Sequence, residues 1–293
     1  MFYGLLSYWI FPVISSLCWL GTLLGLLIHW NVIGKPHYAS MDRSQSIAYI
    51  SDVGAQDLKP LFIAGSCVTV VCVDIGFFAD RWLRHRGRLA RNLTPLEKWL
   101  SAISMVFGII GGAGLILLSI FDTLRHPRAH DVFLLLFIVG YIVSAICLCW
   151  EYHRLGKHFR QVRILRTSYF MKLFFIVIEV ILAIAFVSTN WGHSYNAAAV
   201  LEWAVAFIFT FYLASFVVDL WPARRTHDHD FDTLAAKRAN STATTASPRQ
   251  MEEAGPGSHH APWRDTLDSQ RTLTEPAAAA TTTSGGRISG YNF

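Results

Sequence analysis

Six apolar stretches follow one another along the chain, and each approaches or reaches the length needed to cross a bilayer. An α-helix rises about 1.5 Å per residue, so about 20 apolar residues span the hydrocarbon core. The pattern therefore predicts six transmembrane helices, at residues 8–30, 60–82, 99–121, 131–150, 171–189 and 198–221.

The loops between these stretches alternate between arginine-rich and arginine-poor. Loops 83–98 and 151–170 are strongly basic, whereas loops 31–59, 122–130 and 190–197 carry few or no basic residues. Because basic loops are retained in the cytoplasm, both of them and both termini are predicted to be cytoplasmic. On that side, two glycosylation sequons, at Asn92 and Asn240, should carry no glycan.

The fold class that follows is all-α: a polytopic membrane protein with a six-transmembrane helix bundle at residues 1–221. Residues 222–293 are dominated by Ala, Thr, Ser, Gly and Pro and contain few aliphatic residues. Such a segment buries too little apolar surface to offset the entropy of ordering it. We therefore expect a disordered cytoplasmic tail.

Composition agrees with a membrane protein. Mean hydropathy is +0.37 and only 15% of residues are charged, against about 25% in soluble domains. The formal charge of +5 lies in short loops beside the spans, so it indicates topology rather than a nucleic-acid partner.

All five cysteines lie within predicted spans, which excludes an ectodomain held together by disulfides. Cys147 and Cys149, at the cytoplasmic end of the fourth span, are candidates for S-acylation. Packing as small apolar side chains is the simpler interpretation.

Glycines at small-xxx-small spacing occur in the first span (Gly21, Gly25) and the third (Gly108, Gly112). In a bilayer such spacing permits close approach of two helices. We favour packing within one chain over homodimerisation, with the third span as a central helix.

Acidic residues inside the spans are Asp74, Glu179, Glu202 and Asp219. A charge at bilayer depth costs about 2.5–3.5 kcal/mol or more, so such residues are functional candidates. Asp74 and Glu179 both lie eight residues from the cytoplasmic ends of their spans, about 12 Å deep. If the two carboxyl groups lie in contact, they would share a proton or bind a cation. The alternative is that both are neutral and each forms a hydrogen bond to a neighbouring helix.

Polar residues in the arginine-poor loops form three segments, at 49–55, 121–130 and 196–203. In the first, Ser-Asp followed by Gly54 is typical of a turn in which glycine takes a positive φ. We expect the three segments to fix the outer loops to the helix ends and to contact lipid headgroups. The predicted outer-face cluster is Ser51, Asp52, Gly54, Asp122, His126, His130, Glu202 and Trp203.

These segments together resemble the Frag/DRAM/Sfk family of six-span membrane proteins. The matching patterns are I-S-D-x-G-A at 50–55, F-D followed by His after the third span, and the Glu-Trp pair that opens the last span. The cytoplasmic runs 80–89 and 151–156 and the segment 216–219 are most similar to the fungal Sfk-type branch. The resemblance covers about residues 8–222.

The resemblance implies a non-enzymatic regulator in the plasma membrane. No catalytic residue is carried over from the family, and we expect no cofactor and no metal site. It implies support of phosphatidylinositol 4-kinase activity, with effects on phospholipid asymmetry and sterol retention. The implied partners are anionic phospholipids, phosphoinositides, sterol and a phosphatidylinositol 4-kinase complex. Other branches of the family imply autophagy control or remodelling of GPI-anchor lipids, with a Golgi or a vacuolar or lysosomal location.

The basic loops support a lipid-binding role independently of the resemblance. They hold ten Lys and Arg residues, more than orientation requires, and each one near an anionic leaflet contributes about 1 kcal/mol. The predicted lipid or partner contacts are Arg84, Arg86, Arg88, Arg91, Arg154, Lys157, Arg160, Arg163 and Arg166.

Two further function classes stay open. A metal-dependent lipid hydrolase would use Asp122, His126 and His130, spaced four apart, because zinc takes three or four N or O ligands. However, Pro127 interrupts a helix there and no H-E-x-x-H motif is present. A small-solute or proton transporter would use the intramembrane acids, but the spans show no inverted repeat.

Overall fold

The computed structural model describes residues 8–90, 92, 94–158, 163–221 and 223. These residues form seven helices: α1 (Ile10–Val32), α2 (Ile50–Gly54), α3 (Lys59–His85), α4 (Pro95–Ile120), α5 (Pro127–His158), α6 (Arg163–Trp191) and α7 (Tyr195–Leu220). All except α2 are long and apolar enough to cross a membrane. The predicted all-α fold class with six spanning helices is therefore confirmed. Apart from Ala223, the predicted tail lies outside the described residues.

The helices extend beyond the apolar stretches where the basic loops were predicted. The fourth predicted span stops at residue 150, but α5 continues to His158; the fifth starts at 171, but α6 begins at Arg163. The α4 helix also starts early, at Pro95, where Thr94 and Glu97 form a capping box. An apolar stretch marks the hydrocarbon layer, and a helix whose polar residues are capped or paired can continue past it.

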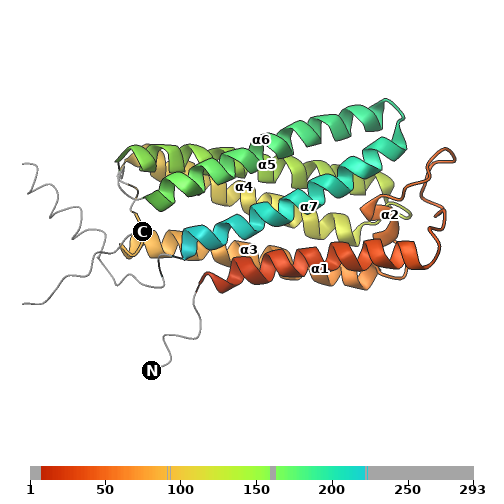
Figure 1. Ribbon diagram of the computed structural model, residues 1–293, viewed down its shortest axis with the longest axis horizontal. Coiled ribbons are helices and arrows are strands. Elements are labelled where there is room, and N and C mark those ends of the chain that lie inside the picture. Colours follow the sequence, from red (N-terminus) through yellow and green to blue (C-terminus); the bar gives the residue numbers. More distant parts are fainter. Residues whose placement is uncertain (1–7, 91, 93, 159–162, 222, 224–293) are drawn as a thin grey trace, which may run out of the picture. The chain divides into compact units, whose positions relative to one another are not determined.

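The six long helices form a closed ring in which each packs against its neighbours in the chain, and α7 returns to pack against α1. Figure 1 shows the helices running side by side along the bundle. One end carries the segment 33–49 and α2, and we call it the loop end. At the other end α3, α5 and α7 finish and α4 and α6 begin; we call it the basic end.

Glycines allow α4 to approach both of its neighbours closely. A Cβ added at Gly111 would lie 2.9 Å from the backbone nitrogen of Tyr141 on α5, and one at Gly112 would lie 2.6 Å from Val70 on α3. Such distances require a shift of the neighbouring helix, so these positions accept only glycine without rearrangement. By contrast, a Cβ at Gly21 would have nothing within 4 Å. The third-span glycines therefore pack within the chain, as predicted.

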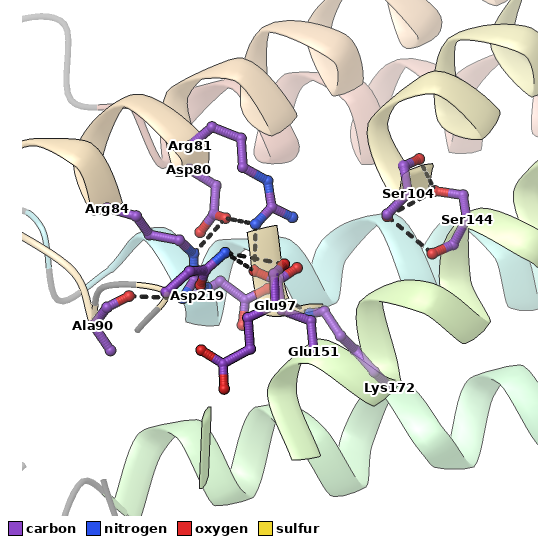
Figure 2. Close-up of polar contacts among 11 residues, drawn as sticks. Asp80, Arg81, Arg84, Ala90, Glu97, Ser104, Ser144, Glu151, Lys172 and Asp219 are labelled. Atoms are coloured by element: carbon purple, nitrogen blue, oxygen red, sulfur yellow. Dashed lines mark hydrogen bonds and ion pairs between the residues drawn. The ribbon is translucent and has the colours of Figure 1, made fainter. Parts of the chain in front are cut away.

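Buried side chains join the helices across the bundle. Ser104 on α4 and Ser144 on α5 donate to each other's carbonyl oxygens, at 2.9 and 2.7 Å, and Figure 2 shows the pair. Phe209 on α7 makes edge contacts with Trp19 on α1 and Tyr141 on α5, at centroid distances of 6.3 and 5.1 Å. The aromatic cluster holds α1, α5 and α7 around the centre of the ring.

Candidate functional site

At the loop end, Asp52 organises the chain between α1 and α3. Its side chain is buried and accepts hydrogen bonds from the Ser40 hydroxyl (2.6 Å), the Tyr49 amide (3.0 Å) and the Gln45 side chain (3.2 Å). Three donors from one segment satisfy the carboxylate without a cation. The segment 40–52 is thereby folded onto its own helix, α2.

A second set of bonds ties this segment to α7. The Glu202 carboxylate accepts from the Ile50 amide at 2.8 Å, and the Trp203 indole donates to the Ala48 carbonyl at 3.0 Å. Earlier in α7, Asn196 accepts from the Ser46 amide at 2.7 Å. The Glu-Trp pair of the sequence pattern is thus the anchor that fixes α2 to the last helix.

The turn predicted at Gly54 is wrong. Residues 50–54 form the short helix α2, and the glycines with positive φ among the described residues are Gly34 and Gly87. A Cβ at Gly54 would lie 2.6 Å from the ring of Phe62. Glycine is required there because the aromatic ring of α3 packs against its backbone, and Ser51 beside it is buried.

Asp122 lies in a separate polar cluster between α4 and α5. It accepts from the Lys59 ammonium group at 2.5 Å and from the Arg125 amide at 2.7 Å, and 3% of its side chain is exposed. Burial raises the pKa of Asp122, but the bonds from Lys59 and Arg125 and their positive charges outweigh it, so this pKa lies below its ordinary value. The carboxylate joins the start of α3 to the connection between α4 and α5.

In the described part of the chain, no side-chain hydrogen bond or ion pair joins either histidine of this segment to Asp122. Nδ1 of His130 lies 3.0 Å from the Leu118 carbonyl and 2.9 Å from the Phe121 carbonyl, which makes it the protonated nitrogen. His126 is exposed and packs edge-on against the Phe121 ring. Across the described part of the chain, no group of three or more His, Cys, Asp or Glu side chains is arranged to hold a metal ion.

A cavity of about 100 Å³ lies inside the ring, and its walls include residues of all seven helices. Its walls are mainly apolar and aromatic, and the acids among its described lining residues are Glu179 on α6 and Glu202 on α7. One Glu179 oxygen is buried without a hydrogen-bond partner among the described residues. Asp74 does not line this cavity, and no hydrogen bond or ion pair between described residues joins it to Glu179.

The basic end contains a buried network of ion pairs (Figure 2), which includes the fully buried Lys172 on α6. Its ammonium group pairs with Asp219 on α7 and bonds Ser168 at 3.3 Å, and it lies 4.2 Å from the centroid of the Phe216 ring. Lys172 and Asp219 are 0% and 2% exposed. Asp219, predicted as an intramembrane acid, is therefore half of a salt bridge between α6 and α7.

The same network joins α3 to α5. Arg81 pairs with Glu151 at 2.5 Å, and Asn92 donates to the same carboxylate at 2.9 Å. Arg84 donates to Asp80 at 2.8 Å and to the Ala90 carbonyl at 3.0 Å, as Figure 2 shows.

This geometry corrects the prediction that Arg84 contacts lipid. Its side chain is 7% exposed and lies over the ring of Tyr152. The i,i+4 spacing of Asp80 and Arg84 is a sequence signal that could have indicated the pair.

Other predicted contacts do reach the surface of the basic end. Arg86, Lys157 and Arg166 are exposed, and we call these three residues the basic surface. Arg86 lies over the exposed Trp82 ring and Arg166 over the exposed Phe170 ring, at 4.9 and 6.0 Å from the centroids.

The remaining predicted contacts are less exposed or undescribed. Arg154, about one-third exposed, lies 3.8 Å from Glu97, and Arg88 is half-buried and donates to the Ala223 carbonyl. Arg91, Arg160 and the side chain of Arg163 lie outside the described residues.

The two acylation candidates differ in environment. Cys149 is buried in the hydrophobic core, so its thiol is not available to a modifying enzyme, and the prediction is wrong for this residue. Cys147 is half-buried and stays a candidate.

Comparison with known proteins agrees with the family resemblance. Residues 7–223 match the family described as Frag1/DRAM/Sfk1/Cwh43P N-terminal domain. Protein sfk1 of Schizosaccharomyces pombe is 32% identical over 215 residues, which cover 73% of this chain and 64% of the relative. Protein SFK1 of Saccharomyces cerevisiae is 31% identical, over 55% of this chain and 54% of the relative.

The chain thus matches less than two thirds of the length of each of these two fungal proteins. No solved structure shows significant similarity to it. The family match covers all six long helices and both polar clusters of the loop end. This chain belongs to the Frag1/DRAM/Sfk1 family of membrane proteins.

Proposed function

We propose that this protein is a non-enzymatic regulator of lipid organisation in the plasma membrane, which supports phosphatidylinositol 4-kinase signalling and phospholipid asymmetry. Its contact with lipid and with the kinase machinery lies at the basic end, which faces the cytoplasm. The family assignment supports a role like that of the Sfk-type branch.

One observation carries this proposal: among the described residues of the basic end, some cations are exposed, whereas every acid is buried. The described acidic residues of that end are Asp80, Glu97, Glu151 and Asp219, and all four are buried. Arg86, Lys157 and Arg166 are exposed. The described surface that meets the cytoplasmic leaflet is therefore positive. The four buried acids lie among five buried or half-buried cations, which are Arg81, Arg84, Arg88, Arg154 and Lys172.

The energy available from this surface is substantial. Each Lys or Arg near an anionic leaflet contributes about 1 kcal/mol, so three contribute about 3 kcal/mol. Trp82 and Phe170 beside them are exposed, and tryptophan is typical of the level of the headgroups. The basic surface is thus suited to phosphatidylserine, to phosphoinositides and to an acidic face of a peripheral kinase complex.

The buried network positions this surface. Arg86 follows α3, Lys157 lies near the end of α5, and Arg166 lies in the first turn of α6. Because ion pairs join α3 to α5 and α6 to α7, the helix ends that carry the cations are held together. Removal of an exposed cation should change lipid contact without changing the fold.

The test replaces the basic surface by Arg86→Gln, Lys157→Gln and Arg166→Gln in a Saccharomyces cerevisiae strain without its own relative. The matched control replaces three exposed cations of the loop end, Lys35, Arg43 and Arg128. A fluorescent reporter of phosphatidylinositol 4-phosphate is imaged at the plasma membrane.

We expect the basic-surface variant to lower the reporter signal while the control keeps it, with both proteins at the plasma membrane. An unchanged signal in the basic-surface variant would contradict the proposal. A wild-type protein found in the Golgi or vacuole would favour the autophagy or GPI-anchor roles of the other family branches.

A further inference from the structure

The cavity inside the ring is not used by the proposed function, and its shape is distinctive. On α7 its lining runs from Glu202 to Tyr212, and on α5 from Leu134 to Ala145. Ten or eleven helical residues correspond to about 15 Å along the bundle. A volume of about 100 Å³ spread over that length describes a narrow slot, which runs from the loop end towards the middle of the bundle.

The ionisable side chains of the slot are of one kind. Glu179 and Glu202 line it, and no Lys, Arg or His is among its described lining residues. Glu202 is held by the Ile50 amide, whereas one Glu179 oxygen is buried without a hydrogen-bond partner in the described part of the chain. A buried acceptor without a donor is costly, so an occupant that donates hydrogen bonds would be stabilised there.

Aromatic rings surround these acids. The lining includes Trp19, Phe62, Tyr141, Phe186, Phe209 and Tyr212. The faces of aromatic rings attract cations, and ammonium groups are bound in proteins by such rings. Carboxylates together with aromatic walls therefore select an ammonium group over a hydroxyl group.

We propose that the slot binds the ammonium end of a slender amphiphile, a long-chain amine, with Glu179 as the acceptor of its hydrogen bonds. A volume of about 100 Å³ holds the ammonium group and the first carbons of the alkyl chain, which the apolar walls beside the acids contact. Phospholipid headgroups with an amine also carry a phosphate a few atoms away, and the described lining offers no cation to meet it. The ligand is thus an amine without an adjacent anionic group.

The binding test uses the purified full chain in lipid nanodiscs, with thermal unfolding followed during titration with dodecylamine below its critical micelle concentration. Dodecanol has the same chain without the charge, and dodecylphosphocholine adds a phosphate. We expect saturable stabilisation by dodecylamine, and at least tenfold weaker effects from dodecanol and dodecylphosphocholine. Equal effects of dodecanol would overturn the role of the charge, and equal effects of dodecylphosphocholine would overturn the exclusion of a phosphate.

Variants then locate the site. Glu179→Gln should weaken dodecylamine binding about tenfold or more, the loss typical of a hydrogen bond to a charged group. Asp74→Asn is the matched control, because Asp74 is also a span acid with a buried, unpaired oxygen but does not line the slot.

Filling the slot gives a second test that keeps both acids. Ala183→Leu places a larger side chain in its wall, with Ala185→Leu, outside the lining of the same helix, as control. Dodecylamine affinity should fall in Ala183→Leu and remain in Ala185→Leu. If affinity is unchanged in both Glu179→Gln and Ala183→Leu, the proposal is wrong.

Discussion

Replacement of Lys172 by methionine should be among the most damaging single changes in the bundle. Methionine keeps most of the side-chain length but removes the ammonium group that pairs with Asp219. The two side chains are 0% and 2% exposed, so water cannot replace the lost partner. Among the described residues, Asp219 would keep the Ser168 hydroxyl as its one side-chain donor.

The magnitude follows from the cost of an isolated buried charge. Breaking a buried salt bridge by removing one partner costs about 3–5 kcal/mol of unfolding free energy. For a domain of this size, 1 kcal/mol corresponds to about 2–4 °C in Tm. The Tm of Lys172→Met should therefore fall by roughly 6–20 °C.

The assay is thermal unfolding of the detergent-purified protein. Unfolding is measured as the loss of the monodisperse peak of the folded protein. Lys98→Met makes the same substitution at an exposed position of the same end, and its Tm should stay within about 2 °C of wild type. The double variant Lys172→Met, Asp219→Leu removes both charges and should recover most of the loss, because an apolar pair can replace a buried ion pair. A double variant as unstable as Lys172→Met would refute the reasoning.

Two further predictions concern packing and pH. Gly111→Ala should lower the free energy of unfolding by about 1–3 kcal/mol, because its Cβ would lie 2.9 Å from the Tyr141 backbone nitrogen. Gly21→Ala should be neutral or slightly stabilising, because its Cβ would have nothing within 4 Å. The Tm values of the two variants test this prediction. Because the pKa of Asp122 lies below its ordinary value, its contact with Lys59 contributes stability above the ordinary carboxyl pKa of about 4. That contribution is lost as pH falls through the lowered pKa, so Asp122→Asn should lose less Tm than wild type between pH 7 and pH 3.

The number of spanning helices was predictable from the sequence because the length of an apolar stretch is set by the bilayer. The ends of α5 and α6 were not, because they depend on charged residues that find partners inside the protein. Lys172 lies one residue from the start of the fifth predicted span and Asp219 two residues from the end of the sixth. Their similar depth at the same end was a signal for the salt bridge. The sequence does not show, however, which side of each helix faces the other.

The candidate sites show the same division. Asp52, Glu202 and Trp203 were found because they recur as a family pattern, and their bonds explain why α2 is fixed to α7. The slot depends on how side chains of seven helices fill the ring, which no local pattern encodes. For the same reason, the sequence suggested a pair of Asp74 and Glu179, whereas the structure brings Glu179 and Glu202 to one cavity.

The orientation of the bundle underlies the proposed function, because the basic surface can meet the cytoplasmic leaflet only if the basic end is cytoplasmic. Asp42→Asn creates an acceptor sequon with Arg43 and Ser44 in the exposed segment of the loop end. The native sequon at Asn92 lies at the basic end. We predict an endoglycosidase-sensitive increase in mass for Asp42→Asn and none for the wild type. A glycan on the wild type at Asn92, with none gained by Asp42→Asn, would invert the topology and contradict the account.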